Sequence, residues 1–119
     1  MIFFDAYAII EIINGNENYQ KFKDEVILTN TLHLSEVFYS LLRNFGEKKA
    51  GQIISNLDFE FIEISEDIVI KSAEFKFKNK NKNFSYSDCI GYISAISEGI
   101  VFLTGDKEFE GFEGVEFVK

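Results

Sequence analysis

Short apolar runs recur along the chain and are separated by longer segments of mixed polarity. Runs such as MIFF and IVFLT contain almost only large apolar residues, which is typical of strands buried on both faces of a sheet. In FEFIEI, residues 59–64, apolar and acidic residues alternate, which favours a strand with one solvated face near an edge of the sheet. The predicted strands are residues 1–4, 25–30, 59–64, 100–104 and 115–118.

The segments between these runs carry helical signals. Residues 32–45 show the clearest pattern, an apolar stripe formed by Leu34, Val37, Phe38, Leu41, Leu42 and Phe45. Gly46 ends this helix, and residues 47–57 continue helically. The other predicted helices are residues 6–13, 17–24, 65–78 and 85–98, with a polar loop at 79–83 and a turn or short helix at 106–110.

Strands that alternate with helices predict an α/β fold. The expected architecture is a central, mainly parallel, five-stranded sheet flanked by helices, connected by right-handed crossovers. The length of 119 residues and the absence of proline indicate one domain, residues 1–119, without a Pro-rich linker. In such sheets ligands bind beyond the carboxyl ends of the strands. Asp5 and Asp106 follow two predicted strands, so we expect both at this edge.

Composition narrows the function classes. The net charge is −8, from 20 acidic and 12 basic residues, which argues against broad electrostatic binding of nucleic acid but not against a substrate held through metal ions. A single cysteine and a single histidine exclude an internal disulfide and make a Cys/His zinc site implausible. No apolar run approaches the roughly 20 residues of a membrane span, and the start lacks a basic signal-peptide region. We expect a cytoplasmic protein without a membrane partner.

Four carboxylates are candidates for chemistry, and each has a structural alternative. Asp5 and Asp106 can cap the helical segments that follow them, and Asp88 fits a capping box with Ser85. Asp88 shares a helix face with small residues, which leaves room for a metal, a substrate or another chain. Glu36 lies opposite the apolar stripe of its helix, where a solvated side chain is the simpler interpretation.

Taken together, the four carboxylates predict a divalent metal site. Like charges that converge raise one another's pKa and destabilise the fold unless a cation neutralises them. Mg²⁺ or Mn²⁺ is the expected ion, because it prefers oxygen ligands and retains several waters. Such a site can activate water for attack on a phosphodiester. The predicted metal ligands are Asp5, Glu36, Asp88 and Asp106.

The chain resembles a PIN domain, and most closely the small VapC-type toxin ribonucleases. The matching segments are MIFFDAYAII, LHLSEVFYSLL, FSYSDCIGYISAISEGIVFLTGDKEFEG and GVEFV, which together span essentially the whole chain. The resemblance implies a three-layer sandwich and a metal-dependent endoribonuclease with Asp5, Glu36, Asp88 and Asp106 as its acidic quartet. It also implies that Thr104 orients an acid or a water. The implied partners are RNA, a cognate antitoxin and a second copy of the chain in a homodimer.

Two positions differ from the family pattern. After the first Asp the family usually has Thr or Ser and then Ser, whereas Ala6 and Tyr7 stand here. Between the Thr and the last Asp it often has a basic residue or Asn, whereas Gly105 stands here. Phosphate contacts are therefore expected from Arg43, Lys107 or the stretch 76–82, for which the alternative is a solvated helix end.

Other functional interpretations remain open from the sequence. A catalytically inactive PIN fold could act only as a binding protein. A receiver-like signalling domain would need a phosphate-accepting Asp after its central strand, and residues 59–64 end without one. Nothing in the sequence brings Cys89 and His33 together as a nucleophilic pair, and His33 is a weak candidate for a general base. Phe109 and Phe112 lie near Asp106, but Phe residues more often form core than stack on bases.

Overall fold

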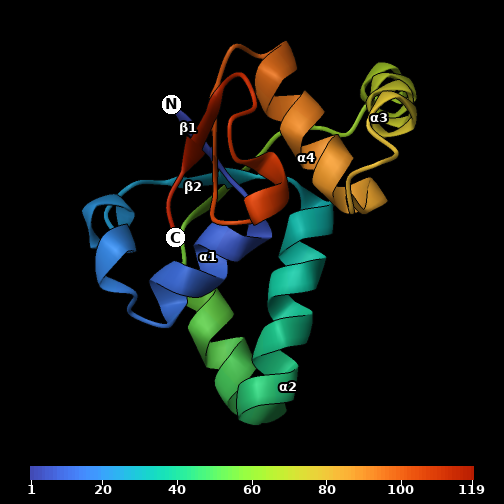
Figure 1. Ribbon diagram of the computed structural model, residues 1–119. Helices are drawn as coiled ribbons and strands as arrows, with labels where there is room; N and C mark the ends of the chain where they lie inside the picture. The colour runs from blue at the N-terminus through green and yellow to red at the C-terminus, as the bar shows by residue number, and fades with distance from the viewer.

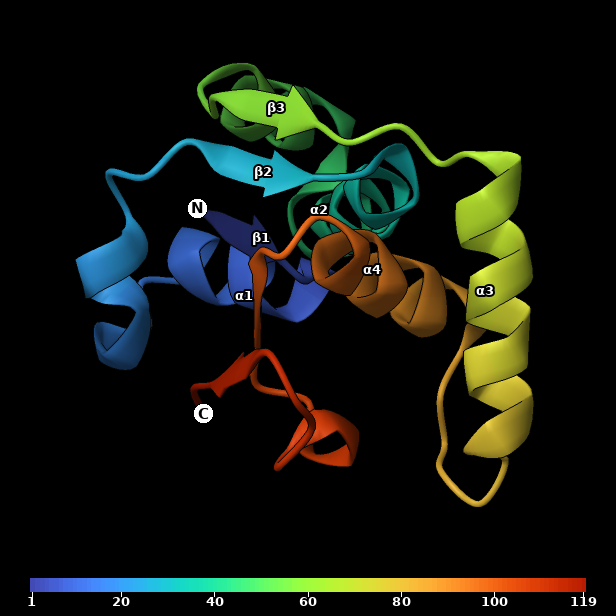
Figure 2. The same cartoon turned by 90° about the horizontal axis from the view of Figure 1, so that it is seen from above.

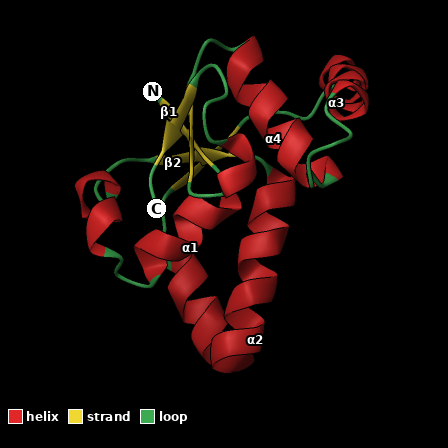
Figure 3. Ribbon diagram, in the orientation of Figure 1, coloured by secondary structure: helices red, strands yellow, loops and turns green.

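The computed structural model describes residues 1–119, and its centre is a five-stranded sheet with helices on both faces (Figures 1 and 3). Every pair of neighbouring strands is parallel. The predicted strands are confirmed, each somewhat shorter than the apolar run that indicates it. Their bounds are β1 (Ile2–Phe4), β2 (Ile27–Thr29), β3 (Phe59–Phe61), β4 (Val101–Thr104) and β5 (Val115–Phe117).

The strand order β3-β2-β1-β4-β5 places the first strand in the middle of the sheet. In β1, Phe3 is paired with Leu28 of β2 on one side and with Phe102 of β4 on the other. β3 lies at an edge, which confirms the solvated face expected from its alternating sequence. Because β1 is central and parallel to β4, Asp5 and Asp106 follow strands that end at the same edge.

The predicted helices are also present. Their bounds are α1 (Ala6–Ile13), α2 (Thr31–Ser55), α3 (Glu66–Lys78) and α4 (Tyr86–Ser97), with 3-10 helices η1 (Glu17–Phe22) and η2 (Lys107–Phe109). Ser65 and Ser85 cap α3 and α4 through their side chains, as the sequence indicates. None of the helices combines the length and the apolar character that crossing a bilayer requires.

α2 is two helices joined at Gly46. This glycine has φ +80° and ψ 169°, a conformation that L side chains rarely adopt, so the helix breaks there. Figure 1 shows the first half running away from the sheet and the second half returning toward it. The prediction that one helix ends at Gly46 and a second follows is therefore confirmed.

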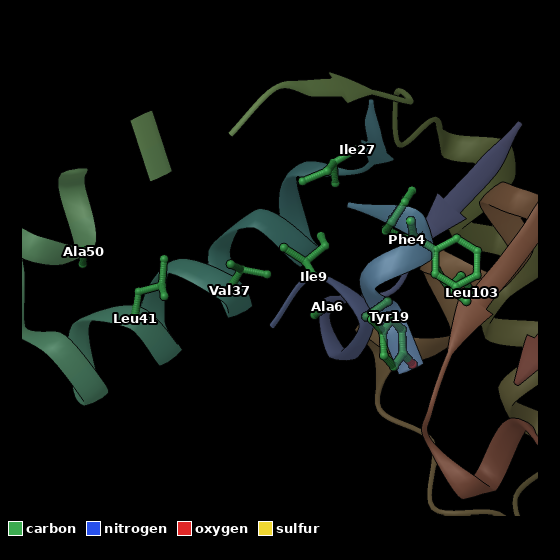
Figure 4. Close-up of a cluster of buried hydrophobic side chains, with 11 residues drawn as sticks. Phe4, Ala6, Ile9, Tyr19, Ile27, Val37, Leu41, Ala50 and Leu103 are labelled. Carbon is green, nitrogen blue, oxygen red and sulfur yellow. The ribbon is translucent and has the colours of Figure 1, made fainter. Parts of the chain in front are cut away.

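Two apolar clusters hold the layers together. On one face of the sheet α1, η1 and α2 cover Phe4 and Leu103 (Figure 4). On the other face α4 and η2 cover Phe3 and Phe102. Adjacent residues of β1 and of β4 thus enter opposite cores, which confirms strands buried on both faces and a three-layer sandwich. α3 packs against α4 at the periphery, as Figure 2 shows from above.

We predict that Phe102→Ala lowers the free energy of unfolding by about 3–5 kcal/mol, because the ring is fully buried and its loss leaves a cavity. Urea denaturation measures this change. Val101→Ala is the matched control, since Val101 is adjacent on the same strand but 39% exposed. A similar loss in both variants would contradict the assignment of Phe102 to the second core.

Candidate functional site

Asp5 lies at the middle of the carboxyl edge of the sheet, where β1 turns into α1. Its Oδ1 accepts the Ala6 N–H at 3.0 Å, so the capping role considered from the sequence is real. Its Oδ2 accepts the Thr104 hydroxyl at 2.6 Å. The carboxylate is only 4% exposed. Capping alone does not require such burial, since a cap can be satisfied at the surface.

Thr104 connects the acids that follow β1 and β4. Its hydroxyl donates to Asp5 and accepts the Asp106 N–H at 3.1 Å. Asp106 in turn caps η2, because its Oδ1 accepts the Glu108 N–H at 3.0 Å. One fully buried hydroxyl therefore fixes the positions of both strand-end acids relative to each other.

Asp88 reaches the same region from the first turn of α4, and Glu36 reaches it from the second turn of α2. Asp88 forms the predicted capping box: its carboxylate accepts the Ser85 N–H at 2.8 Å, and its N–H donates to the Ser85 hydroxyl at 3.0 Å. Glu36 Oε2 accepts the Ser87 hydroxyl at 2.8 Å, which ties α2 to α4. Glu36 is therefore fixed by a contact between helices, although it stands on the polar face of its own helix.

His33 is the residue whose place the sequence did not reveal. Its Nδ1 lies 3.1 Å from the Ala6 N–H donor, 3.3 Å from Asp5 Oδ1 and 3.4 Å from Glu36 Oε2. The ring is fully buried. The only available signal was its position three residues before Glu36, which puts both side chains on one side of the helix.

The small-residue face of α4 accommodates this histidine. Its Nε2 is buried without a hydrogen-bond partner and packs against Gly91, where a Cβ would overlap the ring. The room expected beside Asp88 for a metal, a substrate or another chain is therefore filled at Gly91 by His33. Glycine is needed at this position so that α4 can approach the beginning of α2.

The acids influence one another's ionisation. The pKa of Asp5 is raised from 3.8 to about 7, chiefly by burial; the Thr104 hydrogen bond opposes this rise, and the charges of the other three acids add to it. Burial also raises the pKa values of Glu36 and Asp88, with Asp88 adding to the first and Asp106 to the second. Burial lowers the pKa of His33 to about 4, so its ring is neutral at pH 7.

The other three predicted acids thus lie close enough to Asp5 for their charges to raise its pKa, but the four side chains do not enclose a metal position. No group of three His, Cys, Asp or Glu side chains is arranged to hold a metal ion. Mg²⁺ does not require one, because it commonly binds through one or two carboxylates and keeps several waters. The donors are all oxygens, and a cation would relieve the cost of an ionised, buried Asp5. In donor chemistry and charge the residues fit this ion.

The predicted substrate contacts lie on different sides of the acids. Arg43 lines an open cavity of about 470 Å³ together with Glu36 and Tyr39, and its guanidinium lies 5.9 Å from the Tyr39 ring centroid. Lys107 is exposed at the start of η2, directly after Asp106. Cys89 is buried, and burial raises the pKa of its thiol to about 11, so it is not an activated nucleophile.

Gly105, between Thr104 and Asp106, is enclosed by Tyr7 and the C-terminal segment. A Cβ at this position would overlap the Tyr7 ring and the Val118 carbonyl oxygen. The Tyr7 ring and the C-terminal segment therefore leave no room for a side chain at position 105.

Comparison with solved structures gives close matches over the whole chain. A toxin–antitoxin complex from Klebsiella pneumoniae matches with a TM-score of 0.77 and 21% identity, covering 98% of this chain and 96% of that one. Mycobacterium tuberculosis VapC20, a toxin that cleaves the sarcin–ricin loop, matches with a TM-score of 0.73 and 18% identity, covering 98% and 99%. VapBC2 from Rickettsia felis, bound to a promoter DNA fragment, matches with a TM-score of 0.73 and 17% identity, covering both chains fully.

These identities establish the fold alone, and a comparison with curated proteins gave no significant match. The family model described as PIN domain matches residues 2–115, which is nearly the entire chain and includes all four acids. The resemblance drawn from the sequence is therefore confirmed: this chain belongs to the PIN domain family.

Proposed function

We propose that this protein is a metal-dependent endoribonuclease that hydrolyses RNA phosphodiester bonds with Mg²⁺ or Mn²⁺. The observation that carries the proposal is the buried carboxylate of Asp5, whose pKa is raised to about 7 by burial and by the charges of Glu36, Asp88 and Asp106. A structural cap gains nothing from three further acids around it. A divalent cation bound among the acids would neutralise their mutual repulsion and could activate a water molecule.

In this mechanism the ion would supply an activated water and neutralise charge on the phosphodiester during in-line displacement. Asp5, Asp88 and Asp106 would be its main ligands, with Glu36 binding through water or positioning the nucleophile. Thr104 holds Asp5 and Asp106, Ser85 holds Asp88, and Ser87 holds Glu36. These contacts keep the acids oriented before substrate arrives, and burial of Asp5 excludes competing water. No covalent enzyme intermediate is needed.

The proposed context is a toxin–antitoxin pair. The matched solved structures include a toxin–antitoxin complex and VapBC complexes, which supports a cognate antitoxin as the protein partner. A homodimer is the proposed assembly, and apolar side chains exposed on α3, such as Val69 and Ile70, offer a surface for association. The receiver-like interpretation is wrong, because the chain is a PIN domain over residues 2–115.

We predict that the wild-type protein cleaves a pool of structured RNAs in Mg²⁺ or Mn²⁺ but not in EDTA, and that Asp5→Asn reduces the rate at least about 100-fold, since the neutral amide cannot serve as an anionic ligand. Gel analysis of end-labelled RNA measures both effects. Asp24→Asn, an exposed acid that precedes β2 and therefore lies toward the opposite edge of the sheet, is the control and should cut normally.

Cleavage that survives EDTA or the Asp5→Asn substitution would contradict the proposal. If wild type binds Mn²⁺ but cleaves no RNA in the pool or in total RNA from a bacterial lysate, the inactive binding fold replaces the nuclease. If it binds no divalent ion, the four-carboxylate site itself is wrong.

We predict that Asp5→Asn stabilises the metal-free protein at pH 7.5 by up to about 4 kcal/mol, because it removes a buried charge whose pKa is raised from 3.8 to about 7. Thermal unfolding in EDTA measures this effect. Mn²⁺ should then raise the melting temperature of wild type, since it binds only the folded state, and leave Asp5→Asn nearly unchanged. An Asp5→Asn protein that is less stable than Asp24→Asn in EDTA would argue against repulsion among the acids.

The pH dependence follows from the raised pKa of Asp5. Between about pH 4 and pH 7 the unfolded chain has lost this proton and the metal-free folded chain retains it, so the free energy of unfolding falls as pH rises. We expect wild type and Asp5→Asn to be equally stable near pH 4 and to diverge toward pH 7.5, in urea denaturation with EDTA. A difference that does not vary with pH would contradict the raised pKa.

A further inference from the structure

The end of α3 and the beginning of α4 form a groove that the proposed mechanism does not use. Its volume is about 350 Å³, and it is lined by Ala73, Lys76, Phe77, Lys80, Lys82 and Tyr86. Phe77 is 71% exposed and Tyr86 is 70% exposed, which makes them the two most exposed aromatic side chains of the protein. Figure 2 shows α3 standing beside α4 at one end of the molecule, with the connecting loop at its tip.

The lysines of the groove lie close to aromatic rings and form no salt bridge with an acid. Lys76, Lys80 and Lys82 form no salt bridge, although the chain carries eight more acids than bases. Instead, Lys80 Nζ lies 4.8 Å from the Phe77 ring centroid, and Lys76 Nζ lies 5.1 Å from that of Tyr86. Lys76 Nζ also donates to the Phe84 carbonyl oxygen, whereas the ammonium groups of Lys80 and Lys82 have no hydrogen-bond acceptor. Lysines and exposed rings thus share one surface, which is the composition of sites that bind single-stranded nucleic acid.

The groove is joined to the acidic site. Tyr86 is two residues before Asp88, and Lys76 is close enough to Asp88 to oppose the rise of its pKa. On the other side, the Asn83 N–H donates to Glu108 Oε1, which connects the loop to η2 directly after Asp106. A strand of nucleic acid with its scissile phosphate at the acids would therefore have its neighbouring nucleotides over the groove.

We propose that this groove binds nucleotides of a single-stranded RNA segment next to the scissile phosphate. Phe77 and Tyr86 stack on bases, and Lys80 and Lys82 contact phosphates. This inference rests on the proposed nuclease function and adds to it a nucleotide-binding subsite between α3 and α4. The small volume and the two separate rings suit one or two unpaired nucleotides and exclude a duplex, whose bases are not available for stacking.

RNA is favoured over a protein partner by the charge pattern. A protein interface at this groove would gain little from its three lysines, since interface cores are depleted in lysine. Each lysine increases the affinity for a polyanion, because each phosphate contact releases a counterion. The chain carries a net charge of −8, whereas three lysines line this groove beside the acids, so the groove offers a phosphate backbone local positive charge.

The test is binding of a fluorescein-labelled random RNA pool, about 10 nucleotides long to cover the usual site size, measured by anisotropy in Mg²⁺. All proteins carry Asp5→Asn to prevent cutting. Phe77→Ala and Tyr86→Ala should each weaken binding about 10-fold, and Lys80→Ala should reduce the slope of log K against log salt by about 0.7. Phe61→Ala, an exposed aromatic on the edge strand, and Lys48→Ala, an exposed lysine on α2, should bind like the parent.

Equal affinities for groove and control variants, or no binding by the parent, would overturn the proposal. So would a loss of dimer in Phe77→Ala by light scattering with RNA affinity unchanged, because the groove would then be a protein interface. Cleavage by the same variants without Asp5→Asn separates the two proposals. If the groove variants cleave RNA in a metal-dependent way as fast as wild type, only the groove proposal is contradicted. If RNA binding depends on the groove but no variant cleaves RNA, the groove proposal is supported and the nuclease proposal is contradicted.

Discussion

The site depends on the hydrogen bond from the Thr104 hydroxyl to the Asp5 carboxylate. It exists because β1 and β4 are adjacent and parallel, with Phe4 paired to Leu103, so the next residues of both strands emerge side by side. The bond lowers the cost of burying Asp5 without abolishing it, and the pKa remains raised to about 7. The same hydroxyl accepts the Asp106 N–H, so one side chain sets the separation of two acids. A shift of register would move Thr104 away and leave the carboxylate buried without its donor.

Two of the residues that depart from the family pattern, Tyr7 and Gly105, pack against each other. The Tyr7 ring and the Val118 carbonyl oxygen occupy the space that a side chain at position 105 would fill. The hydroxyl that the family usually carries just after its first Asp is absent, but the carboxylate still receives a hydroxyl hydrogen bond, from Thr104 on the neighbouring strand. The departures therefore change how the acids are supported and leave Asp5 with a donor on each oxygen.

Most of the architecture could be predicted because it is encoded locally. Apolar runs, Gly46 and the Ser85–Asp88 capping box each act over a few residues, and the rule that parallel strands end at one edge places Asp5 with Asp106. His33 could not be predicted, because its role arises where the starts of α1 and α2 meet the glycine face of α4. Helical periodicity likewise assigned Glu36 to a solvated face, and only the packing of α2 on α4 gives it Ser87 as a partner.

The acidic character of the chain and a polyanionic substrate are compatible because their charges act at different ranges. Repulsion between exposed acids and RNA is screened beyond about 8–10 Å at physiological salt, so the net charge of −8 weakens encounter but does not control the bound state. Within that distance the local arrangement of charged side chains determines whether a phosphate is attracted or repelled. In the proposed mechanism the acids around Asp5 would repel a phosphate until a divalent ion joins them, whereas the lysines between α3 and α4 would attract the neighbouring phosphates without an ion. Metal binding would then turn the repulsion between the acids and the scissile phosphate into attraction. In this way productive RNA binding would depend on the bound divalent ion.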